Sequence, residues 1–332
     1  MSKRASTICG LQPRTYGFFM VSGGVLWLCP DALLLRLYES DGYTQLFWKN
    51  VFFVVFELLG FLCYFKLSRV LLLCKNTGLV FVTVQGLSYA FVMTTFTFSC
   101  INTAIANTLV LIATGPLWSA LFSWAFLAER IRPSTLTAIA LGFASIAFIF
   151  LGEALKAEQS STTWLGNALG LACAIGTGAN FTFLRYSLKQ RPKSTEIPGL
   201  IVGGLIMIIF AIIVGGSSVL SFTNPILDPW LAVFQGGIVS TVAQSCLQTG
   251  PRYLLSSEVA LLMLIETILS PLMVYAAGFE APPQFTAIGG AALVLVLGAY
   301  FSYELKKEYE EKKTTPSGAD FDNAQLTAVN AV

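Results

Sequence analysis

The chain has no histidine and few charged side chains, since Asp, Glu, Lys and Arg make up only 11% of its 332 residues. Soluble proteins contain about 25% of these residues. Without histidine, the chain lacks the side chain that most often binds metals and moves protons near neutral pH. Its net charge of +2 gives no reason to expect a nucleic acid partner. We therefore expect no metal, no other cofactor and no bound nucleic acid.

The placement of cysteine and aspartate argues against metal sites, disulfides and enzyme activity within the membrane. The seven cysteines are scattered, mostly within apolar runs, and no two form a Cys-x-x-Cys pair. We interpret them as small hydrophobic residues rather than as metal ligands or disulfides. An enzyme acting inside a membrane would need a Ser/Lys pair, two aspartates or a His/Glu metal set. We find no aspartate deep in any apolar run, so we predict that the protein is not an enzyme.

What the chain has in abundance is hydrophobic residues, which make up 55% of it. They form apolar runs of about 20 residues, the length that crosses a bilayer as a helix. The sequence therefore predicts an all-α membrane protein in contact with the lipid bilayer, with ten transmembrane helices. Their expected ranges are 16–35 (interrupted at Pro30 and Asp31), 45–64, 78–98, 102–127, 134–151, 164–186, 198–215, 229–249, 254–277 and 284–303.

The basic residues predict the orientation of these helices. With the N-terminus inside, only Arg36, Lys49 and Lys156 of the 20 basic residues lie outside. Because cytoplasmic loops carry an excess of Lys and Arg, both termini should be cytoplasmic. We expect a cytoplasmic N-terminal segment at 1–15, a polar connector at 152–163 and a disordered cytoplasmic tail at 304–332. The host membrane should be the plasma (inner) membrane.

The two halves of the chain share short matches at a nearly constant offset. The matching pairs are Gln85-Gly86 with Gln235-Gly236, Glu129 with Glu280, Thr137-Ala138-Ile139 with Thr286-Ala287-Ile288, and Gly17 and Arg36 with Gly166 and Arg185. The offsets are all about 150 residues. Each half, 16–151 and 164–303, contains five predicted helices, and an odd number requires opposite insertion of the two halves. Inverted repeats of this kind are typical of many secondary transporters.

Several stretches resemble EamA-type members of the drug/metabolite transporter superfamily. ANTLVLIATGPLWSALFSWAFLAER (106–130) looks like the family's fourth helix, with a central proline and a Glu-Arg exit turn. EVALLMLIETILSPLMVYAAGFEAPP (258–283) is similar to the ninth helix and IGGAALVL (288–295) to the tenth. PDALLLRL (30–37) and FWK (47–49) resemble the end of the first helix and the start of the second. Two residues depart from the pattern: Lys49 stands where Arg is common, and Phe279 where Gly often precedes the exit Glu.

The resemblance covers about residues 16–303 and implies a ten-helix transporter in which two EamA-like repeats enclose a central cavity. Such a protein moves a small metabolite by alternating access, and helices 1, 3, 4, 6, 8 and 9 line its cavity. One form of this function is a proton-coupled exporter of amino-acid or drug-like molecules. A channel or a membrane receptor without coupled transport stays open as the alternative, as does a homodimer.

Glu266 is the first candidate for substrate binding or coupling. It lies in the middle of the ninth predicted helix, where a carboxylate costs at least about 2.5 kcal/mol. Because burial favours the neutral carboxyl, Glu266 could exchange a proton; alternatively it is a neutral group that hydrogen-bonds a neighbouring helix. Glu258 is the second candidate, or else an interfacial partner of Arg252. We expect Pro271 to loosen the same helix.

The other candidates for substrate binding or coupling are amide and aromatic side chains within the predicted helices: Asn107, Gln85, Gln235, Gln244, Asn180 and Trp27. Amides in membrane helices also hydrogen-bond across helix pairs, and aromatic rings also pack. For Glu57, in the middle of the second predicted helix, structural and functional roles are equally supported.

Overall fold

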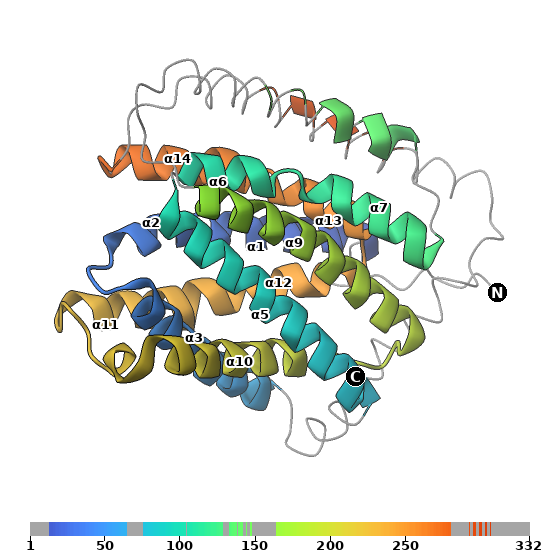
Figure 1. The fold of residues 1–332 in the computed structure, drawn as a ribbon. Helices are drawn as coiled ribbons and strands as arrows, with labels where there is room; N and C mark the ends of the chain where they lie inside the picture. The colour runs from blue at the N-terminus through green and yellow to red at the C-terminus, as the bar shows by residue number, and fades with distance from the viewer. Residues whose placement is uncertain are drawn as a thin grey trace.

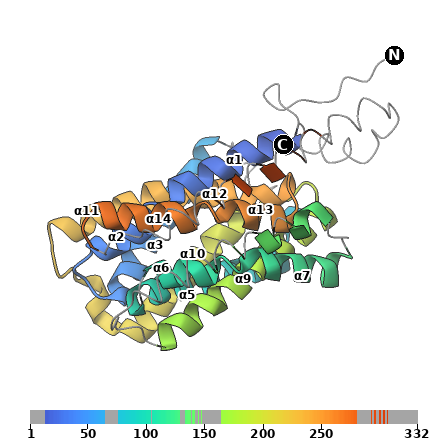
Figure 2. The ribbon, with the colours of Figure 1, turned by 90° about the horizontal axis from the view of Figure 1, so that it is seen from above.

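The computed structural model describes residues 13–64, 76–103, 105–128, 133–137, 139–141 and 164–279, together with residues 144, 147, 292, 295, 296, 299, 300, 303 and 306. Every regular element in this part of the chain is a helix. The long helices lie side by side in one bundle (Figures 1 and 2). The helices predicted at 134–151 and 284–303, the connector at 152–163 and the two terminal segments lie wholly or largely outside the described residues.

The described elements follow the apolar runs in order. They are α1 (Pro13–Leu28), α2 (Asp31–Leu37), α3 (Gly42–Tyr64), α5 (Leu79–Asn102), α6 (Ile105–Ile112), α7 (Gly115–Leu127), α9 (Trp164–Gln190), α10 (Ile197–Gly215), the 3₁₀ turn η1 (Gly216–Leu220), α11 (Leu227–Ala232), the π-helix η2 (Val233–Ser240), α12 (Thr241–Thr249), the 3₁₀ turn η3 (Gly250–Arg252), α13 (Ser256–Met263) and α14 (Glu266–Ala276).

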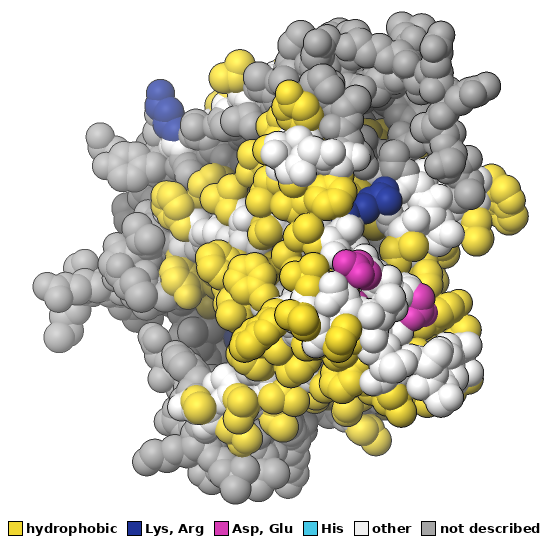
Figure 3. Space-filling model, turned by 90° about the vertical axis from the view of Figure 1, so that its left-hand side faces the viewer, with side chains coloured by type: hydrophobic (Ala, Val, Ile, Leu, Met, Phe, Trp, Pro, Cys, Tyr) yellow, Lys and Arg dark blue, Asp and Glu magenta, His cyan; other side chains and the backbone are white. Residues whose placement is uncertain are grey.

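These elements form eight helices that are long and apolar enough to cross a membrane within the described residues: 13–37, 42–63, 79–102, 108–127, 164–190, 197–220, 227–252 and 256–276. Their outer faces expose large apolar side chains, with Leu79, Trp164 and Ile213 each more than 75% exposed. Even the end of the bundle on the left of Figure 1 shows mostly apolar side chains and few charges (Figure 3). A surface of this composition suits lipid, and the chain is a multi-pass helical membrane protein.

Local sequence explains where α10 begins and ends. Pro198 stands in its first turn, where a missing backbone N–H costs nothing. The helix ends at Gly216, whose φ of +67° is a conformation that only glycine adopts without strain. Between these two residues the sequence is almost continuously apolar, so the only polar groups of the segment are backbone groups paired within the helix.

Three of the eight spans are each interrupted by a two-residue turn. One break, at Cys29 and Pro30, separates α1 from α2, as the sequence predicted. The other two, at 113–114 and at 264–265, divide spans that we predicted to be single helices, so those two predictions were wrong. Pro116 accounts for the break at 113–114, because proline has no N–H to donate to the carbonyl four residues earlier.

The break at 264–265 has a different cause. Pro271 lies inside α14, which continues through it, so the chain does not break where we expected the helix to loosen. Instead, the hydroxyl of Thr267 donates a hydrogen bond of 2.6 Å to the carbonyl of Leu264. A side chain that occupies a backbone carbonyl in this way competes with regular helical hydrogen bonding. The break therefore leaves Glu266 as the first residue of a new helix.

The contacts between helices follow a regular scheme. The helix α5 packs against α9 and α10, while α12 packs against α1 and η2 packs against α3. Two further contacts join α7 to α9 and α13 to α7. Glycine permits the closest approaches: a Cβ on Gly178 of α9 would lie 2.7 Å from the backbone nitrogen of Ser119 on α7. These contacts bring the breaks at 113–114 and 264–265 to one place in the bundle.

Candidate functional site

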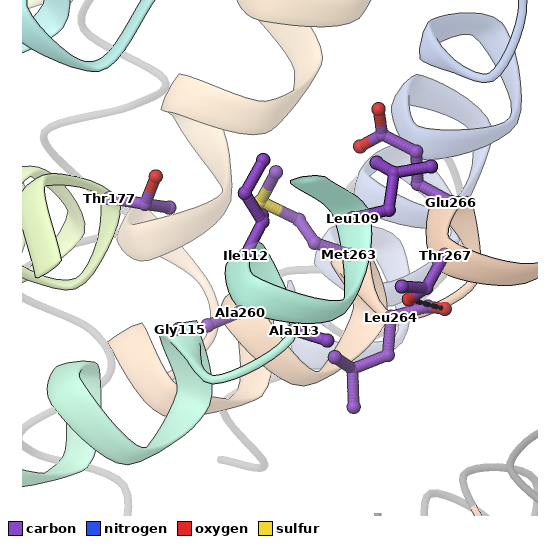
Figure 4. Close-up of a pocket in the computed structure, with 10 residues that line it drawn as sticks. All are labelled: Leu109, Ile112, Ala113, Gly115, Thr177, Ala260, Met263, Leu264, Glu266 and Thr267. Carbon is purple, nitrogen blue, oxygen red and sulfur yellow. Dashed lines mark hydrogen bonds between the residues drawn. The ribbon is translucent and has the colours of Figure 1, made fainter. Parts of the chain in front are cut away.

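A narrow pocket lies between the broken helix pairs α6–α7 and α13–α14, at the breaks 113–114 and 264–265 (Figure 4). It contains about 300 Å³ of empty space, counting the part that opens to solvent, and only about 10 Å³ of this admits the centre of a water-sized sphere. The residues that line it come from α6, α7, α9, α13, α14 and both breaks: Leu109, Ile112, Ala113, Gly115, Thr177, Ala260, Met263, Leu264, Glu266 and Thr267. The pocket is therefore mostly apolar and carries one ionisable group.

That ionisable group, Glu266, is 3% exposed. Its atom Oε1 is buried and has no hydrogen-bond partner among the described residues. Figure 4 shows the carboxyl pointing away from the hydroxyl of Thr267, its neighbour in the chain. Buried polar atoms in native proteins nearly always have partners, and an exception calls for an explanation. Other buried side-chain atoms of the described residues also lack a partner, among them Gln235 Oε1 and Asn180 Oδ1, but Glu266 Oε1 is the carboxyl oxygen of this group and the one that lines the pocket. A site that a proton or a ligand occupies during function is such an explanation.

The other polar side chains of the pocket are already engaged. Thr177 donates its hydroxyl hydrogen to the carbonyl of Cys173 over 2.8 Å, and Thr267 donates to Leu264. Both bonds stay within one span, and each uses the single proton that a hydroxyl can donate. Among the described residues that line the pocket, neither threonine therefore has a hydroxyl hydrogen left to donate, and Glu266 is the only ionisable side chain.

A second buried polar group lies beside the pocket, at the break between α1 and α2. Lys49 of α3 donates to both carboxylate oxygens of Asp31, over 2.8 and 2.9 Å, and Gln235 of η2 donates to Asp31 Oδ1 over 3.0 Å. Asp31 is 1% exposed and Gln235 is fully buried. The helix α2, which begins at Asp31, packs against α14, which begins at Glu266. We call the hydrogen-bonded group formed by Asp31, Lys49 and Gln235 the Asp31–Lys49–Gln235 network.

Sequence reasoning missed two members of this network. We expected no aspartate deep in an apolar run, and that prediction was wrong because Asp31 is buried within the span 13–37. The available signal was the Pro30-Asp31 interruption together with a lysine in the next span. Pairing explains how the chain tolerates both charges, because a buried ion is stable only when it has partners.

Glu258 lies eight residues before Glu266 and is fully buried. It pairs with Arg14 and accepts hydrogen bonds from the hydroxyl of Tyr300, over 3.2 Å, and from the backbone N–H of Leu255, over 3.0 Å. The expected partner, Arg252, instead forms an ion pair of 3.2 Å with Glu196, so that alternative was wrong. Glu258 joins the start of α13 to α1 and to Tyr300, and it does not line the pocket.

The predicted amide and aromatic residues mostly connect helices. Asn180 donates to Gln248 over 3.0 Å, Gln85 donates to the carbonyl of Glu196 over 3.1 Å, and Gln244 contacts the sulfur of Met93. Trp27 is 43% exposed, and its indole N–H donates to the carbonyl of Ile238. These residues, like Gln235, do not line the pocket.

Two further residues complete the comparison with the sequence. Asn107 belongs to α6, but its side chain falls outside the described part of the structure. Glu57 is buried and accepts hydrogen bonds from Ser245 of α12, over 2.9 and 3.1 Å. Glu57 does not line the pocket either. The pocket thus brings together one predicted residue, Glu266, with two threonines and mostly apolar residues that the sequence did not single out.

Comparison with known proteins supports the fold alone. No known family model matches the chain, and no curated protein matches it in sequence. A solved structure described only as "Crystal structure of protein" is similar, with a TM-score of 0.67 and 18% sequence identity. The similarity covers 88% of this chain and 98% of that one. This helical arrangement therefore recurs in another protein, whose description states no function.

Proposed function

We propose that the protein is a secondary transporter of a small molecule that works by alternating access, with Glu266 as its substrate-binding and coupling residue. One observation carries this proposal: a buried carboxyl, one oxygen of which has no partner among the described residues, lines a pocket between two discontinuous membrane helices. Transporters often build their sites near the bilayer midplane from such discontinuous helices. Ionisable groups inside a membrane commonly mark substrate or proton pathways.

The pattern of helix contacts supports a further part of the proposal, namely that the chain consists of two related halves. The breaks at 113–114 and 264–265 are 151 residues apart, close to the offset of the sequence matches. The helix α5 packs against α9 and α10, whereas its counterpart in the second half, 227–249, packs against α1 and α3. Exchange of the halves therefore maps one set of contacts onto the other, as expected for an inverted repeat. We propose on this basis a ten-helix member of the drug/metabolite transporter superfamily.

Proton coupling follows from the surroundings of Glu266. A buried carboxyl favours its neutral form when empty, because burial penalises the charge. Neutral Glu266 lets the empty carrier reorient without moving a bare charge between its two sides. Ionised Glu266 attracts a positively charged group of the substrate. Since one carboxyl cannot hold both, competition between proton and substrate gives antiport, which suits an exporter driven by an inward proton gradient.

The function is tested by transport in proteoliposomes. A thermal-shift screen of leucine, uridine, glucose and isoamylamine identifies a stabilising compound, and counterflow of that compound is then measured. We expect saturable counterflow in the wild-type protein and none in Glu266→Gln. Glu57→Gln serves as the matched control, because Glu57 is also a buried carboxyl but lies outside the pocket. Flux that does not saturate, without counterflow, would indicate the alternative, a channel.

The proposed orientation has its own test. With ten spans and the positive-inside distribution of Lys and Arg, a reporter fused after Val332 is expected to be active in the cytoplasm. Activity on the opposite side of the plasma membrane would contradict the combination of ten spans with a cytoplasmic N-terminus.

A further inference from the structure

The charges around the pocket do not balance. Asp31 and Lys49 neutralise one another, since both oxygens of Asp31 lie within 2.9 Å of the lysine nitrogen. Ionised Glu266 then leaves the pocket with one uncompensated negative charge. A ligand with a single positive charge would restore neutrality in this buried place, where unpaired charges are costly.

Hydrogen-bonding capacity points to the same kind of ligand. Both threonine hydroxyls of the pocket donate to backbone carbonyls, and none of its lining residues is Lys or Arg. Lys49, the nearby cation, is held by Asp31. A substrate carboxylate would therefore find no open side-chain donor among these residues. Burying an ion without partners costs far more than burying an ammonium beside Glu266.

The walls of the pocket determine the size and polarity of the uncharged part of the ligand. They consist mainly of aliphatic side chains, with Leu109 and Ile112 on one broken span and Met263 and Leu264 on the other. In this conformation the free space holds about one water molecule, so a ligand enters only when the walls move apart, and a flexible aliphatic chain requires less movement than a ring system. Met263 has a flexible thioether side chain that adapts to different shapes.

From this balance we infer that the pocket takes a small monovalent organic amine, with one ammonium group on a compact aliphatic body, in preference to a zwitterionic amino acid. The ammonium binds Glu266 Oε1, and the aliphatic body contacts the walls. This inference rests on the proposed function, because it assigns the substrate class of the same site. It also narrows that function, since amino-acid exporters would need a cation for the substrate carboxylate.

Three molecules that share the same branched five-carbon chain test the inference. Isoamylamine carries the ammonium alone, leucine adds a carboxylate, and isoamyl alcohol carries no charge. Binding to the purified protein in lipid nanodiscs is measured by isothermal titration calorimetry. We expect isoamylamine to bind at least about tenfold more tightly than either other molecule, because a hydrogen bond to a charged group and an unpaired buried ion are each worth that factor or more. Leucine binding as tightly as isoamylamine would overturn the inference without any variant.

Two variants place the binding at Glu266. Glu266→Gln should lose isoamylamine binding by about tenfold or more, while Glu57→Gln should retain it. Thermal unfolding of each variant shows whether it is folded. Unchanged isoamylamine affinity in folded Glu266→Gln would overturn the inference.

The inference and the proposed function fail in different ways. Binding of isoamylamine without counterflow would support the pocket chemistry and contradict the transporter. Counterflow of leucine that depends on Glu266, with no response to isoamylamine, would support the transporter and contradict the assignment of an amine.

Discussion

Glu258 and Glu266 stand eight residues apart on the same membrane span, and both are at least 97% buried. Glu258 has Arg14, the hydroxyl of Tyr300 and the backbone N–H of Leu255 as partners. Glu266 has an oxygen without any partner among the described residues. Burial therefore does not separate the two acids, but their partners do.

The difference assigns the two acids to different tasks. A buried charge whose partners are complete holds elements together, and losing one partner leaves the other charge uncompensated. A buried acid left without a partner lowers stability, so its retention calls for another explanation. We assign Glu258 to structure and Glu266 to proton and substrate exchange, and each prediction below tests that division.

The largest expected effect is on transport. Glu266→Gln should reduce transport by about 100-fold or more, since the amide can neither carry the proton nor pair with an ammonium, and a charged hydrogen bond alone accounts for about 10- to 100-fold. The unfolding temperature should stay near the wild-type value, because the amide fills the same space. Counterflow and thermal unfolding on the same preparation give both results. Wild-type transport in this variant would show that Glu266 is structural.

The same substitution at Glu258 should act mainly on stability. Glu258→Gln removes the charge that compensates Arg14, and breaking such a buried pair costs about 3 kcal/mol. A lower unfolding temperature is therefore expected for this variant and not for Glu266→Gln. If the two glutamine variants unfolded alike, the division between the acids would be wrong.

A third substitution perturbs the Asp31–Lys49–Gln235 network by a steric clash with the backbone of Lys49. A Cβ added at Gly236 of η2 would overlap the backbone carbonyl of Lys49, so Gly236→Ala should force η2 and α3 apart. Overpacking of this kind costs about 1–3 kcal/mol. The matched control is Gly23→Ala on α1, where nothing lies within 4 Å of the added Cβ. Thermal unfolding should separate the two variants; equal stability would show that the contact at Gly236 yields easily.

The smallest effect is expected at Glu57. Its carboxyl accepts hydrogen bonds from Ser245, and an amide oxygen can accept one in the same place. Glu57→Gln should therefore cost about 1 kcal/mol or less in stability and change transport less than about twofold. A transport defect as large as that of Glu266→Gln would extend the functional site to Glu57.

The apolar runs predicted most of the described helices to within a few residues, because backbone groups in lipid leave few alternatives to a helix. The run 198–215 and the helix α10 (Ile197–Gly215) agree closely. The break at 264–265 could not be predicted in this way. It accompanies the hydrogen bond from Thr267 to Leu264, whereas the sequence drew attention to Pro271.

The site was predicted in part for a similar reason. Glu266 stood out because a carboxyl in an apolar run is costly in any arrangement of helices. The pairing of Asp31 with Lys49 did not stand out, because it joins two spans across a break and depends on how those spans pack. The same holds for the partner of Glu258, which is Arg14, 244 residues away in the chain.

The most direct test of the exchange at Glu266 is gradient-driven efflux. Vesicles that contain the wild-type protein, Glu266→Gln or Glu57→Gln are loaded with the transported compound, and efflux is followed with and without an imposed pH gradient. We predict that an inward proton gradient accelerates efflux by the wild type and by Glu57→Gln and has no effect on Glu266→Gln. Efflux by the wild type at a rate independent of the gradient would contradict proton exchange at Glu266.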